Sequence, residues 1–269
     1  MRIAVTGAGG MLGTEVVAQA TKDGHTVLAI ERSLAGLPTM SERVSGHILD
    51  MANYADLLPV IDGCDALIHL AAYVSPSAAP EPLVHNNNVV ASYNALSAAQ
   101  EADVMRVCIA SSVNAIGGHY SVAPRYDYFP VDESHPCYAE DAYSLSKWVA
   151  EQQAAAFARR RPGMTIAALR FHALKDRDAM AALWGGRTDG GSKDLWGYTP
   201  ISLAAKACMS AISAEFSGYE AFYVVAPDTP LDARSQDLRD QYYPGVPIRG
   251  ELNGNSAFFD SSKAARLLL

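Results

Sequence analysis

Short apolar, β-branched segments alternate with longer helical patterns along the first two-thirds of the chain. The segment 66–71 carries apolar residues on both of its faces, as a strand sandwiched between two helix layers must. A chain that alternates strands and helices in this way builds a parallel sheet with helices on both faces. The sequence therefore predicts an α/β fold with a doubly wound parallel sheet.

The expected elements are placed by their periodicity and by the turn residues between them. We expect strands at 3–6, 26–31, 44–49, 66–71, 104–111 and 165–171, and helices at 11–22, 54–61, 88–101 and 139–160. Beyond residue 170 the pattern loosens, and the segment 185–197, rich in glycine, is interpreted as a mobile loop or lid. A helix near 201–213 and a strand near 221–226 follow.

Composition narrows the classes of function. The chain has 269 residues, of which 49% are hydrophobic, so it can bury a sizeable core without a metal or a disulfide. A formal net charge of −8 disfavours binding to nucleic acid and to anionic membrane surfaces. The four cysteines show no paired spacing, and no stretch approaches the ~20 apolar residues of a membrane span. We expect a cytoplasmic protein with a small-molecule partner.

A glycine-rich turn at 6–13 follows the first expected strand directly and opens the first expected helix. Gly7 permits a tight turn, Gly10 lets a pyrophosphate approach the backbone, and Gly13 allows the helix to pack closely on the strand. The start of the helix, at Met11 and Leu12, offers free N–H groups and a positive dipole end to phosphates. The sequence therefore predicts a Rossmann-type dinucleotide-binding core at 1–170. Residues 171–269 are expected to form mainly a small substrate-binding region, with some segments returning to the core.

The end of the second expected strand bears on the choice of cofactor. Glu31 stands where an acidic side chain can accept both ribose hydroxyls of an adenosine and repel a 2′-phosphate, which favours NAD. Arg32 can pair with such a phosphate instead, so NADP is possible, and a solvated Glu–Arg pair is a simpler alternative. Asp50, next to Met51, can accept from the adenine amino group or cap the helix that begins near Asn53. Met51 is also expected to contact the cofactor.

A tyrosine and a lysine four residues apart, Tyr143 and Lys147, fall on one face of an expected helix. Lowering a tyrosine pKa of ~10 by ~3 units takes about 4 kcal/mol, which a lysine and a positive nicotinamide can supply together in a partly dry site. Ser111 and Ser112 end the fifth expected strand, at the sheet edge where such folds bind ligands. Each pair alone also fits an exposed helix face or a capped loop.

Together these segments resemble the extended branch of the short-chain dehydrogenase/reductase superfamily, the NAD-dependent epimerase/dehydratase family. The resemblance covers nearly the whole chain and rests on the segments 6–13, 65–72, 88–89, 111–117, 143–147 and 169–171. The pattern Ser-Ser-x-x-x-Ile-Gly at 111–117 is similar to uronate and aldose dehydrogenases of this branch. Ala115, Ile116 and Phe171 depart from the residues that many members carry, which implies a substrate side unlike that of a typical nucleotide-sugar epimerase. The region after Arg170 is also shorter than the C-terminal domain with which such epimerases hold the nucleotide, so we expect a smaller substrate.

The resemblance implies a role for each matching residue. Tyr143 becomes the general acid/base, Lys147 holds the ribose hydroxyls and lowers the tyrosine pKa, and Ser112 orients the substrate oxygen. Ser111 is expected to contact the cofactor, and Asn88, at the start of a helix, to steady the cofactor side of the catalytic site. The remaining cofactor contacts implied by the resemblance are Leu70, Ala71, Ala72, Phe171 and His172.

Substrate contacts are less sharply indicated. Ser75, Ser77, Asn114 and His119 follow strands at the expected cleft, where each can hydrogen-bond a sugar hydroxyl. Arg187 can clamp a carboxylate, although solvating a flexible loop is the simpler role. The Ala-rich helices at 88–101 and 139–160 are expected to form a homodimer, as equivalent helices do in the family.

The sequence therefore predicts an NAD(P)-dependent oxidoreductase that transfers hydride between the nicotinamide and a hydroxyl or carbonyl of a sugar-like small molecule, with Tyr143 as general acid/base. One alternative is a nucleotide-sugar epimerase or dehydratase that retains its NAD. Another is a non-catalytic NAD(P)-binding regulator. The presence of Tyr143, Lys147 and Ser112 together counts against the regulator, because a sensor has no need for proton transfer.

Overall fold

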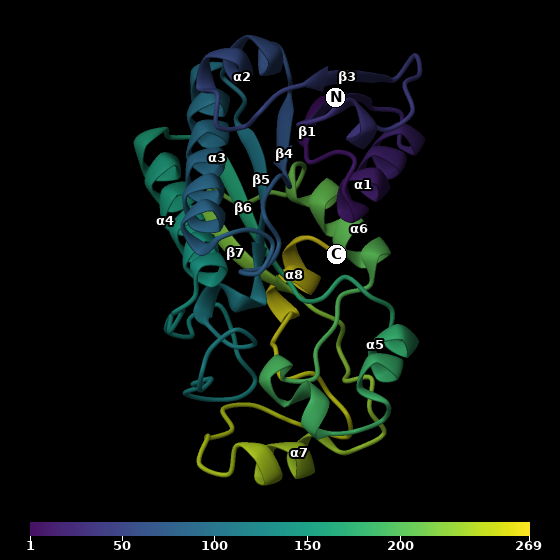
Figure 1. Ribbon diagram of the computed structural model, residues 1–269, viewed down its shortest axis with the longest axis vertical. Helices are drawn as coiled ribbons and strands as arrows, with labels where there is room; N and C mark the ends of the chain where they lie inside the picture. Colours follow the sequence, from purple (N-terminus) through teal and green to yellow (C-terminus); the bar gives the residue numbers. More distant parts are fainter.

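The computed structural model describes residues 1–269, apart from the side chain of Leu34. At its centre lies a sheet whose strands all pair in parallel, in the order β3-β2-β1-β4-β5-β6-β7 (Figure 1). The strands are β1 (Arg2–Thr6), β2 (Thr26–Glu31), β3 (Val44–Ile48), β4 (Ala66–His69), β5 (Arg106–Ser112), β6 (Thr165–Phe171) and β7 (Gly218–Val224). The strand order reverses between β1 and β4, and open α/β sheets bind ligands at such a point.

Helices cover both faces of the sheet (Figure 1). They are α1 (Met11–Lys22), α2 (Tyr54–Ile61), α3 (Glu81–Glu101), α4 (Ala142–Arg160), α5 (Arg177–Trp184), α6 (Ile201–Ala211), α7 (Ser235–Tyr242) and α8 (Ser262–Leu267), with 3-10 turns η1 (Leu34–Gly36), η2 (Val113–Ile116) and η3 (Asp189–Asp194). On one face α1 packs against α6, and on the other α3 packs against α2 and α4. The doubly wound α/β fold predicted from the sequence is confirmed.

The apolar strands are explained by this sandwich. Along β1, Ile3 and Val5 belong to the core beneath α1 and α6, whereas Ala4 belongs to the core beneath α2, α3 and α4. All three side chains are fully buried. A strand covered on both faces needs apolar residues at consecutive positions, which is the pattern that the sequence shows.

Two helices begin at other positions than the sequence pattern indicates. The α3 helix starts at Glu81 rather than near Asn88, because Pro82 suits the first turn of a helix, where its missing N–H is not needed. Asn88 therefore lies within the helix. The α4 helix starts after Asp141, whose side chain accepts the N–H groups of Tyr143 and Ser144 at 2.9 Å each. This cap ends the preceding loop three residues later than the expected start at residue 139.

A third apolar cluster lies at the end of the molecule that carries α5 and α7 (Figure 1). Trp196 is fully buried in it, and its indole nitrogen donates to the carbonyl of Thr188 at 2.6 Å. The Lys193 ammonium donates to the carbonyl of Ser121 at 2.8 Å. The segment 185–197, expected as a mobile loop or lid, is therefore folded onto the rest of the chain, because burying its tryptophan ties it down.

Three further features follow from the described residues. Among them, no helix is both long and apolar enough to pass through a membrane. Cys64, Cys108, Cys137 and Cys208 are all free thiols. Nowhere in the described part of the chain do three or more His, Cys, Asp or Glu side chains gather as a metal site would require.

Candidate active site

The glycine-rich turn has the geometry that the sequence predicts. Gly7 has φ +69°, and a Cβ on it would lie 2.8 Å from the backbone nitrogen of Ala71. A Cβ on Gly13 would lie 2.1 Å from the carbonyl oxygen of Gly7, so this helix position also excludes a side chain. The α1 helix has Gly10 as its N-cap and no side chain bonded to its first N–H groups. These free donors suit the phosphates of a dinucleotide.

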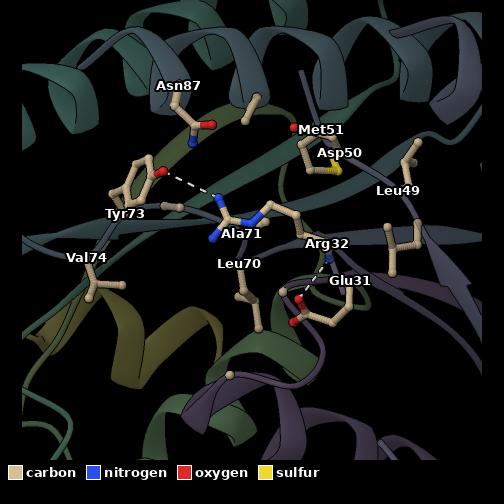
Figure 2. A pocket seen from close by; sticks show the side chains of 15 residues that line it. Glu31, Arg32, Leu49, Asp50, Met51, Leu70, Ala71, Tyr73, Val74 and Asn87 are labelled. Carbon is tan, nitrogen blue, oxygen red and sulfur yellow. Dashed lines mark hydrogen bonds between the residues drawn. The ribbon is translucent and has the colours of Figure 1, made fainter. Parts of the chain in front are cut away.

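A cleft opens at the carboxyl ends of β1, β2 and β4 (Figure 2). It brings together half of the residues that the sequence assigns to the cofactor: Gly7, Gly10, Glu31, Arg32, Asp50, Met51, Leu70, Ala71 and Ala72. Sequence reasoning missed Ile30, Leu49, Tyr73, Val74, Asn87 and Ala91, which also line it. They follow or face the predicted positions, but no motif marks them. The cradle and cleft together fit the adenosine and phosphates of a dinucleotide.

Three predicted residues near the turn do not line this cleft. The Met11 side chain is 64% exposed, and that of Leu12 is buried in the core beneath α1. Gly13 acts through helix packing alone. The contribution of Met11 and Leu12 to a bound phosphate would therefore come from their backbone N–H groups rather than their side chains.

Glu31 and Arg32 point in different directions (Figure 2). The Glu31 carboxylate folds back and accepts the N–H of Gly9 at 2.8 Å and that of Arg32 at 3.1 Å. The Arg32 guanidinium reaches across the cleft and donates to the Tyr73 hydroxyl at 3.4 Å, a contact that raises the arginine pKa. A permanent positive charge thus faces the cleft.

Of the two roles that the sequence left open for Asp50, the structure contradicts the helix cap, and the contact with an adenine amino group stays a prediction. Its carboxylate accepts the N–H of Ala52 at 2.9 Å, which closes the turn before α2. The N-cap of α2 is Asn53. Asp50 lines the cleft all the same, next to Met51, so one face of this side chain borders the cofactor site.

The tyrosine, lysine and serine meet at the carboxyl edge of the sheet. Tyr143 and Lys147 lie one turn apart on α4, with the ammonium nitrogen 5.8 Å from the centre of the phenol ring. The ammonium donates to the carbonyl of Ala110 at 2.8 Å, one strand position before the pair Ser111 and Ser112. All of these side chains are buried except the half-buried Ala110. The close association expected from the four-residue spacing is present.

The acid–base properties differ from the expectation for the free protein. Burial raises the pKa of Tyr143 to about 12, and the hydrogen bond with Ser112 only partly opposes this. Burial also lowers the pKa of Lys147 to about 8, against the charge of Glu151, which raises it. In the protein alone the pKa of the phenol is therefore raised, and its lowering by Lys147 together with a bound nicotinamide stays a prediction.

A small recess connects the cleft to this group. It shares Ala71 and Ala72 with the cleft and is also lined by His69, Asn88 and Lys147. His69 is neutral, because burial and the nearby Lys147 charge lower its pKa to about 3. The recess gives a bound dinucleotide a continuous surface from the glycine turn towards Lys147.

Asn88 and Ser111 hold the protein together around the recess. Asn88 accepts the N–H of Tyr73 at 2.8 Å and donates to the carbonyl of the same residue at 3.0 Å and to the Ser146 hydroxyl at 3.1 Å. It thereby fixes the loop after β4 against α4. The Ser111 hydroxyl donates to Glu151 at 2.5 Å. Its side chain is thus committed to α4 rather than turned to the cofactor as expected.

Phe171 and His172 lie at the end of β6 and line neither the cleft nor the recess. Phe171 packs in the apolar core. The Nδ1 atom of His172 accepts the N–H of Ala173 at 2.7 Å, so its Nε2 atom carries the proton and donates to the carbonyl of Asp194 at 2.9 Å. Burial lowers the pKa of this imidazole, which keeps it neutral. Side-chain contacts of these two residues with the cofactor stay a prediction.

The candidate substrate residues separate into two groups. His119 pairs with Asp194 at 2.8 Å, and the N–H of His119 donates to Asn114 at 3.1 Å. The neighbouring Tyr120 ring, which the sequence analysis missed, lies edge-on to Tyr143 with centres 5.8 Å apart. His119 and Asn114 are thus brought near Tyr143.

The other candidates are exposed and engaged elsewhere. The hydroxyls of Ser75 and Ser77 hydrogen-bond each other at 3.2 Å. The Arg187 side chain is 72% exposed and pairs with Asp189 at 2.8 Å. No other charged partner is seen for Arg187 among the residues that the structure describes, so its local pair accounts for it.

Comparison with known proteins places these features in a family. Residues 3–174 match the model of the NAD dependent epimerase/dehydratase family. A putative dihydroflavonol 4-reductase of Synechocystis is 31% identical over 153 residues, which are 56% of this chain and 43% of that protein. An L-arabinose 1-dehydrogenase (NAD(P)+) of Haloferax volcanii is 32% identical over 185 residues, 66% of this chain and 68% of that protein. This chain thus spans under half the length of the first of these relatives.

Solved structures share the fold. UDP-glucose 4-epimerase of Thermotoga maritima has a TM-score of 0.72 at 17% identity and covers 100% of this chain and 92% of that one. A uronate dehydrogenase variant has a TM-score of 0.68 at 20% identity, over 94% of this chain and 88% of that one. The match of the family model over most of the sheet confirms the resemblance seen in the sequence. This chain belongs to the NAD-dependent epimerase/dehydratase family of enzymes, the extended short-chain dehydrogenases/reductases.

Proposed function

We propose that this protein is an NAD(P)-dependent oxidoreductase that transfers hydride between the nicotinamide and a hydroxyl or carbonyl group of a sugar-like small molecule. One observation carries the proposal. Tyr143, Lys147 and Ser112 lie together, buried at the carboxyl edge of the sheet, and Lys147 lines a recess that shares Ala71 and Ala72 with the cleft at the glycine turn. A protein that only binds the dinucleotide has no need for a phenol and an ammonium at that place.

Each side chain then has a distinct task. The Tyr143 phenol takes the proton of a substrate hydroxyl in oxidation and returns it in reduction. The Ser112 hydroxyl, which already hydrogen-bonds the phenol, fixes the substrate oxygen beside it. The Lys147 ammonium stabilises the phenolate and can donate to a ribose hydroxyl. When bound, the nicotinamide supplies the hydride acceptor and a positive charge that favours the phenolate.

The sugar-like substrate is supported by a relative rather than by a pocket. The Haloferax volcanii protein that matches two-thirds of this chain is an L-arabinose 1-dehydrogenase. His119 and Asn114, near Tyr143, offer hydrogen-bonding groups suited to hydroxyls. Arg187, the residue considered for a carboxylate, pairs with Asp189 on the surface. A neutral sugar therefore fits this side better than a uronic acid held by Arg187.

A screen of cofactor absorbance tests the proposal. Aldoses, uronic acids and simple ketones are each incubated with the protein and either NAD or NADP. The proposal predicts net formation or consumption of reduced cofactor with at least one sugar. Conversion of a nucleotide sugar without any net change of cofactor would instead identify an epimerase, the reaction named for several proteins of similar fold. Binding of cofactor with no turnover of any compound would contradict an oxidoreductase.

A further inference from the structure

The α4 helix carries a third buried polar residue in line with the tyrosine and the lysine. Glu151 follows Lys147 by four residues, as Lys147 follows Tyr143, so all three share one helix face. The Glu151 residue is only 1% exposed. A carboxylate so deeply buried is costly unless donors surround it, and the proposed reaction gives it no direct task.

Donors from the sheet saturate this carboxylate. Arg170 binds it in a bidentate manner, with Nε 2.9 Å from Oε1 and Nη2 2.7 Å from Oε2. The hydroxyl of Ser111 donates to Oε1 at 2.5 Å, and that of Tyr219 donates to Oε2 at 3.2 Å. Glu151 therefore connects α4 to β5, β6 and β7 at once.

These contacts lie beside the catalytic serine. Ser111 pairs with Arg170 across β5 and β6, and Arg170 pairs with Tyr223 across β6 and β7. The Arg170 guanidinium also donates to the Tyr223 hydroxyl at 3.2 Å. On β5, Ser111 directly precedes Ser112, while Ala110 accepts the Lys147 ammonium at 2.8 Å. Consecutive residues of β5 are thus held by consecutive turns of α4, which fixes the height of Tyr143 over Ser112.

The packing of α4 against β5, β6 and β7 does not by itself require an ion pair between Glu151 and Arg170. A buried pair of charges is weak evidence for stability, since well-packed apolar residues replace such pairs at little cost. The pair instead fixes the position of α4 along β5, and it places a negative charge one helical turn from the Lys147 ammonium. Lys147 is also faced by Tyr143 on α4 and by the neutral His69 on β4. Glu151 is the charge that favours the protonated lysine there.

We propose that Glu151 is a positioning residue, which holds Tyr143 and Lys147 in register with Ser112 and keeps the Lys147 side chain in its ammonium form. The inference extends the proposed function, because a register between phenol and serine matters only if they act on one substrate oxygen. It assigns a mechanistic role to an ion pair that lines neither the cleft nor the recess.

The first test needs no substrate. The titration of Lys147 is followed by NMR of isotope-labelled lysine, with the signal identified by its absence in Lys147→Gln. Glu151→Gln should lower the pKa of Lys147 by about one unit, because the variant lacks the carboxylate charge that favours the ammonium. Glu215→Gln makes the same change at an exposed site before β7 and should leave the pKa of Lys147 unchanged. An unchanged Lys147 titration in folded Glu151→Gln would overturn the proposal.

Glu151→Gln leaves Arg170 as an unpaired buried charge, and the variant can fail to fold for that reason. A double variant then replaces it in the test. Replacing both residues by glutamine removes both charges and keeps hydrogen-bonding groups for Ser111. We expect this variant to fold and to show the lowered lysine pKa as well. A Lys147 titration like that of the wild type in the double variant would also overturn the proposal.

The second test uses turnover of the best sugar from the screen. In either Glu151 variant we expect kcat to fall by about tenfold or more, because small displacements of reacting groups are costly. The alkaline decline of kcat should begin at lower pH, since the ammonium is lost earlier. Dinucleotide affinity should stay within about threefold, because neither Glu151 nor Arg170 lines the cleft or the recess.

The outcomes separate this inference from the proposed function. A wild-type protein without turnover contradicts the proposed function, while the lysine titration still decides the inference. An active wild type whose Glu151 variants lose only thermal stability, with unchanged kcat and pH profile, would leave the oxidoreductase intact and show Glu151 to be merely structural.

Discussion

At the scale of single residues, the end of β2 sets the charge of the adenosine cleft. The Glu31 carboxylate is held by the N–H of Gly9, while the Arg32 guanidinium extends over the cleft to Tyr73 (Figure 2). Glu31 remains on the cleft wall, where it can also accept a ribose hydroxyl. Arg32 can bind a 2′-phosphate from the other side, because the group to which its guanidinium donates there is the neutral hydroxyl of Tyr73. Both cofactors are therefore expected to bind.

Arg32→Ala should change the affinity for NADP more than the affinity for NAD. Removing a charge-assisted contact with the phosphate should weaken NADP by about tenfold or more, and NAD by about threefold at most. Fluorescence titration gives the dissociation constants of both cofactors. Arg43→Ala is the control, because Arg43 is an exposed arginine in the loop directly before β3. Equal changes in the affinities for NAD and NADP would show that Arg32 does not contact the 2′-phosphate.

Lys147 links function to stability through its pKa. Burial lowers that pKa from 10.5 to about 8, so the folded state holds the proton less tightly than the unfolded state. The cost of burying the ammonium is complete below pH 8 and declines as pH rises towards 10.5, where the unfolded lysine also loses its proton. The group that the reaction needs charged is thus a destabilising one at neutral pH.

Lys147→Met should abolish turnover and yet raise the free energy of unfolding at pH 7 by about 1–2 kcal/mol, after subtraction of the lost hydrogen bond to Ala110. The gain should shrink as the pH approaches 10. Urea unfolding at both pH values measures it. A variant that is less stable than the wild type at pH 7 would show that the ammonium contributes net stability.

The sequence singled out Tyr143, Lys147 and Ser112, which the structure brings together, because the chemistry of these residue types at this spacing is distinctive. It did not identify Tyr73 or Tyr120, since both lie in loops whose paths depend on tertiary contacts. Asn88 fixes the first of these loops, and the pairing of His119 with Asp194 lies beside the second. Glu151 continues the four-residue spacing, but only the fold shows that Arg170 meets it.

At the scale of elements, the start of α4 determines where the phenol lies. Asp141 caps the first turn by accepting the N–H groups of Tyr143 and Ser144. These two hydrogen bonds order the turn that carries Tyr143, the proposed acid/base, so we expect the loss of the cap to lower both stability and turnover.

Asp141→Ala should lower the free energy of unfolding by about 1 kcal/mol, and kcat should fall because the first turn frays. Asp141→Asn keeps an acceptor oxygen and should stay close to the wild type in both measurements. Urea unfolding and sugar oxidation rates give the two values. If alanine and asparagine behave alike, the cap is not what holds Tyr143.

Periodicity predicted the central strands well, because β1, β2, β4 and β6 are short, apolar and bounded by turn residues. It misplaced the start of α3 and the bounds of β7, Gly218–Val224 instead of 221–226. The residues after Pro82 carry Asn and His among apolar positions, which hides the first two turns of α3. The edge strand β7 begins with half-buried residues, so its first part lacks the apolar signal.

At the scale of the whole molecule, we propose a homodimer built on α3 and α4, which pack side by side (Figure 1). Their outer surface exposes Leu83, Val90 and Tyr93 on α3 and Leu145 on α4, between 40% and 49% each. Large apolar side chains gathered on paired helices indicate a contact surface. A second copy presenting the same face would complete a four-helix arrangement.

Light scattering after size exclusion should give twice the mass of one chain. Val90→Asp with Leu145→Asp should give a single chain, because a desolvated charge in the contact surface opposes association. Val122→Asp, at an apolar residue 88% exposed outside these helices, should leave the dimer intact. A wild-type protein that runs as a single chain at micromolar concentration would contradict this arrangement.

The central claim is that the Tyr143 phenol moves the proton while the rest of the site only binds and orients. The most direct measurement is the rate of cofactor reduction in Tyr143→Phe with saturating NAD and the best sugar, together with NAD affinity. The account predicts that the rate falls by about a thousandfold or more while NAD affinity stays within about threefold, and that Tyr93→Phe changes neither. A Tyr143→Phe variant that reduces NAD at the wild-type rate would contradict the account.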